Sequence, residues 1–350
     1  ILFEHTIKLG LFSLYIARVM RELPLLNRKI IKDKYMVSKF RIGVLVIILN
    51  SLVSVTTILG QDNPSLLQMA VPSLNIAPDA RGGGMGDMGA ATLPDINSQY
   101  WNAAKYAFMG SKAGVSLSYT PWLRKLVNDV ALVNMTGYYK LGNSDLQAVS
   151  ASLRYFSLGE VNIWENIGDV PYGLSPYEMA FDVAYSRKLS ESYSMAVTLR
   201  YIRSDMGTEQ NDESNAGNAF AADISGYLEK YVLLGNAEAL WSFGFNLSNI
   251  GSKISYDGGN TNQYLPAKLT LGTGLLYPID DYNQIGFYLD LNKYMVPYAP
   301  QKEEGETDAD YQTRVDDYKS WSSLSGMMKS FTDSPNGLLK EVMVSVGAEY

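Results

Sequence analysis

Between Ala113 and Tyr350 the chain repeats one pattern about ten times: apolar residues alternate with small or polar ones, and a turn follows. In the segment 193–201, the odd positions are large and apolar and the even positions are Ser, Ala, Thr and Arg. Side chains alternate between the two faces of a strand, so each such segment has one apolar face and one polar face. The pattern predicts β-strands at 113–120, 127–140, 146–158, 177–188, 192–203, 217–230, 237–248, 264–277, 283–294 and 340–350.

Two architectures suit an apolar strand face of this kind. In a soluble sandwich the face points into a core, whereas in an outer-membrane barrel it points at lipid. The connections favour the barrel, because short polar turns such as 141–145 alternate roughly with long loops at 159–176, 204–216 and 295–339. Outer-membrane barrels place short turns at their periplasmic end and long loops at their extracellular end. We therefore expect an all-β, antiparallel transmembrane β-barrel over 113–350.

The N-terminal part indicates export. A short basic stretch precedes the apolar run 42–59, and small Gly60 and a polar, turn-forming segment follow it. Such a sequence is typical of a cleaved signal peptide, which we expect over 36–60. The alternative is a transmembrane helix, because the run is close to the ~20 residues that span a bilayer. Residues 1–35 are expected to be an extension upstream of the true start at Met36, or else a short basic amphipathic segment.

Composition narrows the chemistry. The chain has a formal net charge of −7, and residues 1–60 carry nine of its 29 basic residues but only three of its 36 acidic ones. Residues 61–350 therefore hold 20 basic and 33 acidic residues, a net charge near −13, which gives no electrostatic case for binding nucleic acid. The chain has no cysteine, and its one histidine, His5, precedes the expected signal peptide. Disulfides, the usual zinc sites and Ser-His or Cys-His nucleophiles are thus excluded from the exported part.

Residues 61–112 precede the first predicted strand and do not alternate. They include the run 80–91, whose glycines permit tight turns and close packing against other backbone. The run superficially suggests a phosphate-binding loop, but no strand precedes it and no Gly-Lys-Ser/Thr ends it. We expect neither a nucleotide nor another cofactor there.

The long connection 295–339 has two parts. Its acidic run 301–317 is most often a solvated loop, and a calcium site would need a ligand spacing that the run lacks. Tyr311, Tyr318 and Trp321 fall at helical spacing, and apolar residues continue beyond them. One interpretation is a loop helix that packs on the barrel mouth. The other is a partner-binding surface with these three aromatic residues as anchors, since interface energy concentrates in aromatic side chains.

Three segments together resemble a known family. The run 80–91, followed by Tyr-Trp-Asn-Ala-Ala-Lys-Tyr at 100–106, resembles the N-terminal signature of FadL-type barrels, in which a glycine-rich stretch and an Asn-Pro-Ala-like element form a plug. Here 101–104 lacks the proline. The segment 247–256 resembles a strand end and turn of the PorV branch, so residues 61–350 resemble the PorV (LptO) family of the type IX secretion system. The signature residues are Gly82, Gly83, Gly84, Gly86, Gly89, Trp101 and Asn102.

This resemblance implies a FadL-like barrel of fourteen strands, with residues 61–112 as its plug. About ten strands are visible here, and Tyr350 lies in an alternating segment with no closing hairpin behind it. We therefore expect either a C-terminally truncated chain or a ten-stranded barrel.

The resemblance also implies a function, that of a non-enzymatic shuttle in the cell outer membrane. Its implied partners are the type IX translocon barrel, cargo proteins with C-terminal signal domains, the surface attachment complex, and outer-membrane lipid or lipopolysaccharide. The wider FadL class offers an alternative, transport of hydrophobic small molecules, which needs an apolar pocket behind the plug. An enzyme is not expected, because deacylases of the outer membrane typically need a Ser-His pair.

Overall fold

The computed structural model describes residues 67–350 except for 123, 126, 128, 143–144, 164–169, 208–215, 236, 260 and 335–336. The expected upstream extension at 1–35 and the expected signal peptide at 36–60 lie outside the described residues. Within the described part of the chain, no helix combines the length and the apolar character needed to cross a membrane.

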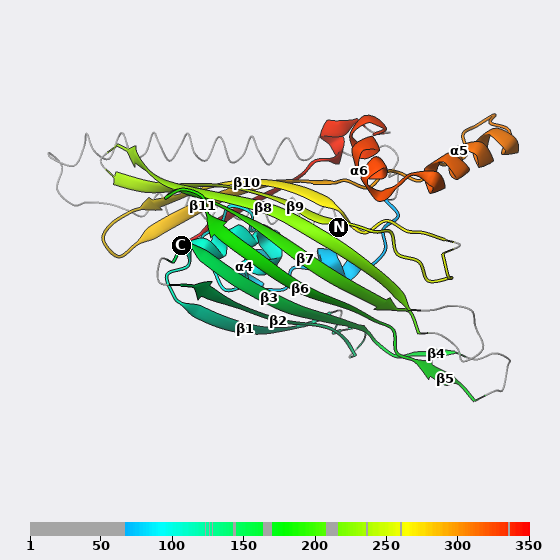
Figure 1. Cartoon of the computed structure of the whole chain (residues 1–350), viewed down its shortest axis with the longest axis horizontal. Helices are drawn as coiled ribbons and strands as arrows, with labels where there is room; N and C mark the ends of the chain where they lie inside the picture. The colour runs from blue at the N-terminus through cyan, green and yellow to red at the C-terminus, as the bar shows by residue number, and fades with distance from the viewer. Residues whose placement is uncertain are drawn as a thin grey trace, which may run out of the picture. The chain divides into compact units, whose positions relative to one another are not determined.

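Ten strands form a single antiparallel sheet in the order in which they follow one another along the chain (Figure 1). They are β1 (Ala113–Pro121), β2 (Val130–Leu141), β3 (Gln147–Leu158), β6 (Tyr177–Lys188), β7 (Tyr193–Asp205), β8 (Gly217–Leu234), β9 (Ala237–Gly251), β10 (Lys268–Pro278), β11 (Gln284–Tyr294) and β12 (Met343–Glu349). All ten predicted strands are confirmed, and no predicted end is displaced by more than four residues. The fold is therefore all-β.

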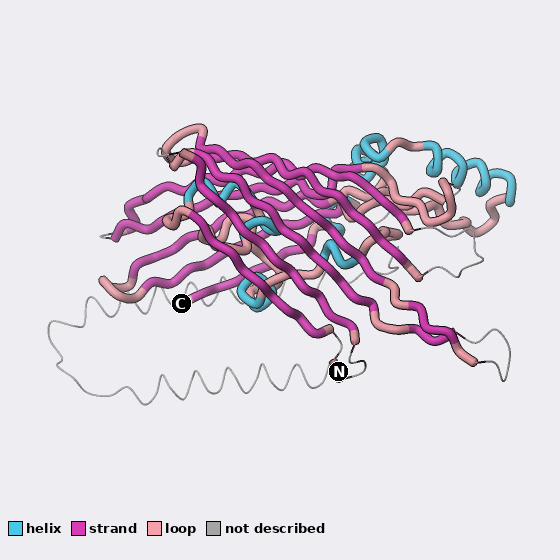
Figure 2. Tube along the Cα trace, turned by 60° about the horizontal axis from the view of Figure 1, so that its bottom comes forward, coloured by secondary structure: helices cyan, strands magenta, loops and turns pink. Residues whose placement is uncertain are grey.

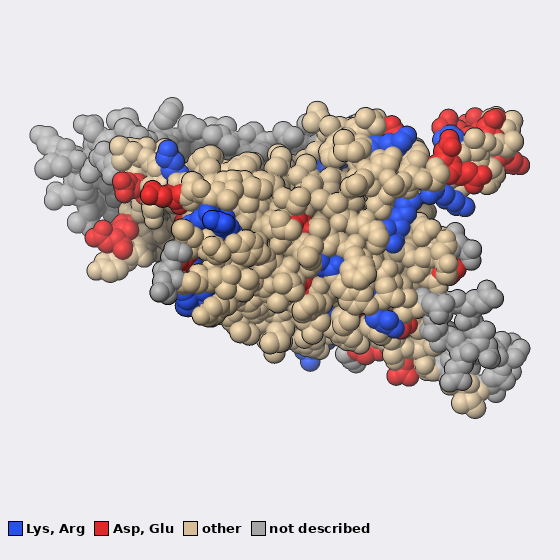
Figure 3. Space-filling model, in the orientation of Figure 1, with Lys and Arg blue, Asp and Glu red and all other residues tan. Residues whose placement is uncertain are grey.

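The predicted alternation is also confirmed, and its apolar side faces outward. On β7, Thr198 and Arg200 are buried, whereas Val197 and Leu199 are 52% and 66% exposed. A soluble sandwich would bury large apolar residues of this kind in its core. The soluble-sandwich alternative is therefore wrong for this sheet. Figure 3 shows this side of the molecule as largely uncharged, with charged side chains gathered toward the ends of the strands.

Short and long connections lie at opposite ends of the sheet. Short turns join β2 to β3, β6 to β7, β8 to β9 and β10 to β11, and longer loops make the other connections. Because successive strands run in opposite directions, all the short turns fall at one end and all the long loops at the other (Figure 1). Gly142 and Gly235 in two of the short turns have φ of +69° and +66°, a region that favours glycine in tight hairpins.

The long loops carry additional structure. A hairpin of β4 (Val161–Ile163) and β5 (Tyr172–Leu174) follows β3, and the sequence pattern did not predict it. The loop between β11 and β12 contains α5 (Asp308–Ser320), α6 (Ser323–Thr332) and the short 3-10 helix η3 (Leu338–Glu341). The helix expected in this loop is therefore confirmed for Tyr311 and Tyr318, whereas Trp321 lies between α5 and α6.

The sheet is curved, and it is open between its edge strands. Among the described residues, no ladder joins β1 to β12. Figure 2 shows the tilted strands side by side, with short helices lying within their curve. The expected barrel would be closed. The ten-stranded sheet, called the wall below, is therefore incomplete between these two strands.

Residues 67–112, called the inner segment below, lie against the polar face of the sheet. They contain η1 (Pro72–Asn75), α3 (Ala80–Gly84), α4 (Ser98–Trp101) and η2 (Ala103–Phe108). Tyr106 of η2 is fully buried and packs with Tyr138 of β2 and Tyr227 of β8. The interior of the curved sheet is thus filled by the inner segment and by the side chains that face it.

Candidate functional site

The glycine-rich run of the inner segment folds around one side chain, Trp101. A Cβ atom at Gly82 or at Gly89 would come within 2.3 Å of the Trp101 side chain, so only glycine fits at these positions. Trp101 Nε1 donates to Asp79 Oδ1 at 2.7 Å, and Asp79 Oδ2 accepts from the Gly82 amide at 2.8 Å as the N-cap of α3. Three of the predicted signature residues, Gly82, Gly89 and Trp101, are therefore in direct contact.

The other signature glycines differ from one another. Gly86 has a φ of +86°, a conformation that favours glycine. A Cβ at Gly83 would make only ordinary contact with Ala77, at 3.7 Å, and one at Gly84 would meet nothing within 4 Å. The structure thus accounts for a glycine at position 86, and at 83 and 84 it shows no contact that requires one.

Asn102 connects the inner segment to the wall. Its Nδ2 donates to the carbonyl oxygens of Ala90 and of Gly226 on β8, both at 2.9 Å. Its Oδ1 accepts from the Ala104 amide at 3.1 Å, which caps η2. Asn102 is fully buried, so any side chain without these groups would leave two carbonyls and an amide without their partner.

Two inward-facing glycines of the wall let the inner segment approach closely. A Cβ at Gly244 of β9 would lie 1.9 Å from the Ala90 carbonyl oxygen, and one at Gly272 of β10 would lie 2.9 Å from the Ala90 side chain. Next to them, Asp290 of β11 accepts from the amides of Gly89 and Ala90 at 2.9 and 3.0 Å. A buried carboxylate with two amide donors fixes this turn of the inner segment against the sheet.

Lys105 also contacts this turn of the inner segment. It is fully buried, and its Nζ donates to the Gly89 carbonyl oxygen at 2.8 Å and to Thr92 Oγ1 at 3.0 Å. Burial lowers the pKa of Lys105 to about 8, because the ammonium has lost its water. Beside it, Tyr106 OH donates to the Ile96 carbonyl oxygen, and burial raises the pKa of this phenol well above its usual value.

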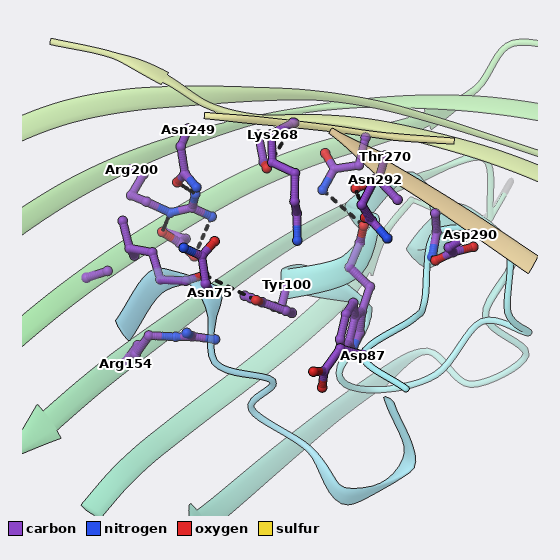
Figure 4. A pocket seen from close by; sticks show the side chains of 17 residues that line it. Asn75, Asp87, Tyr100, Arg154, Arg200, Asn249, Lys268, Thr270, Asp290 and Asn292 are labelled. Atoms are coloured by element: carbon purple, nitrogen blue, oxygen red, sulfur yellow. Dashed lines mark hydrogen bonds and ion pairs between the residues drawn. The ribbon is translucent and has the colours of Figure 1, made fainter. Parts of the chain in front are cut away.

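Two buried arginines, Arg154 and Arg200, occupy the interior (Figure 4). Arg200 of β7 pairs with Asp182 of β6 at 2.6 Å and with Asp223 of β8 at 2.9 Å, so its charge is compensated within the wall. Arg154 of β3 instead binds the inner segment, because its Nη1 donates to the carbonyl oxygens of Ser73 and Ile76 at 2.6 and 3.0 Å. Arg200 thus ties β6, β7 and β8 together, and Arg154 ties β3 to η1.

The cavity between the inner segment and these side chains is small and polar. Its volume is about 30 Å³, enough for about two water molecules. Figure 4 shows Arg154, Lys268 and Tyr100 directed toward it. Pockets that hold drug-sized ligands measure about 300–1,000 Å³ and are mostly apolar. This part of the described interior therefore does not provide the apolar pocket that a transporter of hydrophobic molecules needs.

The inner segment also reaches both edge strands of the open sheet. Arg81 pairs with Asp95 at 2.6 Å and with Glu349 of β12 at 2.8 Å. Ser118 of β1 donates to the Pro78 carbonyl oxygen at 2.6 Å. The segment therefore links β1 to β12, which no ladder joins among the described residues.

A second candidate site lies among the long loops. A cleft of about 280 Å³ runs between α5 and the β9–β10 loop. Tyr311 and Tyr318 line it, and Trp321 packs edge-on against Tyr318 with ring centroids 5.6 Å apart. Tyr318 in turn packs edge-on on buried Tyr264, at 5.7 Å. The structure thus brings the three predicted aromatic residues together, half-buried.

The acidic run around α5 is largely engaged in local contacts. Arg314 pairs with Glu306 at 2.7 Å and with Glu303 at 3.3 Å, and Lys302 pairs with Asp308. Thr307 caps the helix by accepting from the Asp310 amide. The described residues contain no group of three carboxylates, cysteines or histidines arranged to hold a metal ion.

Sequence reasoning missed the residues of the wall that receive the inner segment. In the sequence, Gly244 and Gly272 stand out only as unusually small residues at inward positions of strands in which apolar and polar residues alternate. Asp290 is a carboxylate at such a position. Tyr264 was the first residue of the predicted strand 264–277 but lies in the loop before β10. The inner-segment partners of Gly244, Gly272 and Asp290 lie more than 100 positions away in the chain, so spacing alone cannot connect them.

Comparison with known proteins adds one finding. A family model described as type IX secretion system protein PorV matches residues 60–302, which is more than half of the chain. A search of curated proteins found no match.

Proposed function

Because the chain belongs to the PorV family of type IX secretion system proteins, we propose that it is an outer-membrane barrel that carries secreted proteins to the cell surface. In this proposal it receives cargo with a C-terminal signal domain from the translocon barrel and delivers it to the surface attachment complex. The inner segment is its plug, and the signature residues Trp101 and Asn102 hold the plug in place. The protein catalyses no reaction in this scheme.

The outward face of the sheet supports a membrane location. Large apolar side chains remain exposed along β2, β3, β6 and β7, where a soluble protein would bury them. Strands β3, β6 and β7 contain 12, 12 and 13 residues, and a tilted strand needs about 9–11 to cross a bilayer. The separation of short turns from long loops is that of an outer-membrane protein with its long loops outside the cell.

The observation that carries the carrier function is the cleft beside α5. The interior is filled, so the long loops are the accessible binding surface at the outer end of the molecule. Tyr311, Val315 and Tyr318 of α5 line the cleft together with residues of the β9–β10 loop. A concave site with aromatic side chains suits a docked protein segment, because aromatic anchors in pockets supply most interface energy.

A double substitution in the cleft tests this function. Tyr311→Ala with Val315→Ala removes two cleft side chains from α5, a helix in which no residue is fully buried. We expect a several-fold loss of cargo in affinity isolation of the tagged protein from native membranes. Gln312→Ala, on an exposed position of α5, is the control and should retain cargo.

A deletion defines the outcome that would contradict the cleft. If the chain without residues 301–330 inserts into the membrane and still isolates cargo at the normal yield, the loop is not the binding surface. Insertion is checked by the shift in gel mobility on heating, so loss of the barrel cannot be mistaken for loss of binding.

A further inference from the structure

Helix α6 lies against the outside of the wall. Met327 is buried together with Ala267 and Met295, and Leu247 of β9 and Leu269 of β10 pack against this cluster. These two leucines face each other across the β9–β10 ladder, on the side opposite the inward-facing Gly244 and Gly272. Figure 1 shows α6 beside β9 and β10.

The contact between α6 and its neighbours is close. A Cβ at Gly326 would come within 2.6 Å of the Tyr264 ring, so the helix lies directly on that side chain. Phe331, one turn beyond Met327, extends the contact with the wall cluster. The helix is thus held in place through Gly326, Met327 and Phe331.

Two large apolar side chains of α6 have no such cover. Leu324 and Met328 are 63% and 70% exposed, and they stand one turn apart on the same side of the helix. The neighbouring side carries Ser325 and Thr332, which are also exposed but polar. The apolar surface therefore continues without a break from the wall contact to Leu324 and Met328 and then gives way to polar residues.

Two side chains at α6 are of the kind found at a lipid–water boundary. Trp321 lies just before the helix, and Lys329 Nζ stands 4.1 Å from the centre of its ring. Tryptophan combines a large apolar body with one polar N–H group, and lysine extends its charge toward water from an apolar stem. Both side chains are therefore suited to the headgroup layer of a membrane.

We propose that α6 lies flat in the headgroup layer of the outer leaflet, with Leu324 and Met328 directed into the acyl chains. Ser325 and Thr332 then face water, and Trp321 marks the boundary. The occupant of the exposed face is lipid, because this face continues the outward apolar row of β9 and β10 that includes Leu247 and Leu269. This inference rests on the proposed membrane location of the barrel. It places α5 and its cleft immediately above the membrane surface.

Single cysteines test this arrangement, since the natural chain contains none. Leu324→Cys and Met328→Cys, each labelled with an environment-sensitive nitrobenzoxadiazole dye, are reconstituted in phosphatidylcholine–phosphatidylglycerol vesicles with brominated acyl chains. Both positions are exposed, so the substitutions remove no packing inside the protein. We expect at least a twofold quenching of both labels relative to vesicles without bromine, and no quenching by aqueous iodide.

Ser325→Cys and Thr332→Cys are the matched controls on the polar side, where iodide should quench and bromine should not. Leu199→Cys on the outward face of β7 reports whether the wall itself lies in lipid.

If the Leu199 label is quenched by bromine and the Met328 label is not, α6 does not lie in lipid although the barrel is inserted. If the Met328 label is shielded from iodide but insensitive to bromine, protein covers this face and the proposal is wrong. If the Leu199 label also fails to respond to bromine, the membrane barrel itself is refuted.

Discussion

At the scale of single residues, the closest contact between wall and inner segment is at Gly244. A Cβ there would lie 1.9 Å from the Ala90 carbonyl oxygen, a backbone atom that Asn102 already holds by a hydrogen bond. Gly244→Ala should therefore lower the free energy of unfolding by about 1–3 kcal/mol, as overpacking in a core does. Urea titration in detergent measures the change.

The control for this substitution is Gly110→Ala. An added Cβ at Gly110 meets nothing within 4 Å, so its effect should stay within about 0.5 kcal/mol. Equal unfolding midpoints for the two variants would show that the inner segment does not pack on β9 as closely as described.

Lys105 makes the stability of the inner segment depend on pH. Burial lowers its pKa to about 8 from an ordinary value of 10.5, which applies in the unfolded chain. Between these values the unfolded state binds more protons than the folded state, so the free energy of unfolding rises as the pH increases from about 8 to about 10.5. At 1.36 kcal/mol per pKa unit, this rise is at most about 3 kcal/mol.

Lys105→Met isolates this contribution. The variant should be less stable throughout, because the Gly89 carbonyl and Thr92 hydroxyl lose their donor, and it should lack the rise between about pH 8 and 10.5. Urea unfolding of both proteins across this range provides the comparison. Parallel pH profiles for the two proteins would assign the titration to another group.

Only some of the residues that hold the inner segment against the wall could be predicted from the sequence. Gly82, Gly89, Trp101 and Asn102 belong to one local run, so a family resemblance in that run could single them out. Asp290 lies about 200 positions away and acts through two backbone amides, which leave no mark on the sequence.

At the scale of elements, the seating of α6 can be tested at Gly326. An added Cβ would approach the Tyr264 ring to 2.6 Å, a clash expected to cost about 1–3 kcal/mol. Alanine is better than glycine in a helix by only about 1 kcal/mol, so the clash should prevail. Gly326→Ala is expected to release α6 from the wall and to speed proteolytic cleavage between β11 and β12.

Ser325→Ala is the neighbouring control, because Ser325 is exposed and its change should leave the cleavage rate unaltered. The heat-induced shift in gel mobility should be the same for both variants, since the wall is untouched. Slower or unchanged cleavage of Gly326→Ala would mean that α6 does not rest on Tyr264.

The elements differ in how far sequence alone defines them. The ten strands were predicted closely because the period of two and the turn residues are local signals. The short helices of the inner segment have no such signal. Their positions depend on wall groups, such as Ser194, which donates to the Ala104 carbonyl oxygen at 2.7 Å. The hairpin of β4 and β5 was missed because each strand has only three residues, too few to show a period.

At the scale of the whole molecule, polarity is inverted relative to a soluble protein. The interior holds charged and amide groups, many of which are paired with one another or with the inner segment, whereas the outward face is apolar. Burying so many polar groups is costly unless each finds partners, and the inner segment provides many of them. The polar interior and the segment that fills it therefore depend on one another, and the apolar exterior supports the proposed membrane location.

Leu199→Arg tests directly whether the outward face of the sheet lies in lipid. Leu199 lies in the middle of β7 and is 66% exposed, so an arginine there would meet the centre of the bilayer if the sheet is inserted. The expected cost of folding into lipid vesicles is about 2–4 kcal/mol, measured from the urea dependence of the heat-modifiable band. Glu191→Arg introduces the same side chain in the short turn between β6 and β7, where water reaches it, and should have little effect. Equal insertion of the two variants would place Leu199 in water and remove the physical basis for a membrane barrel.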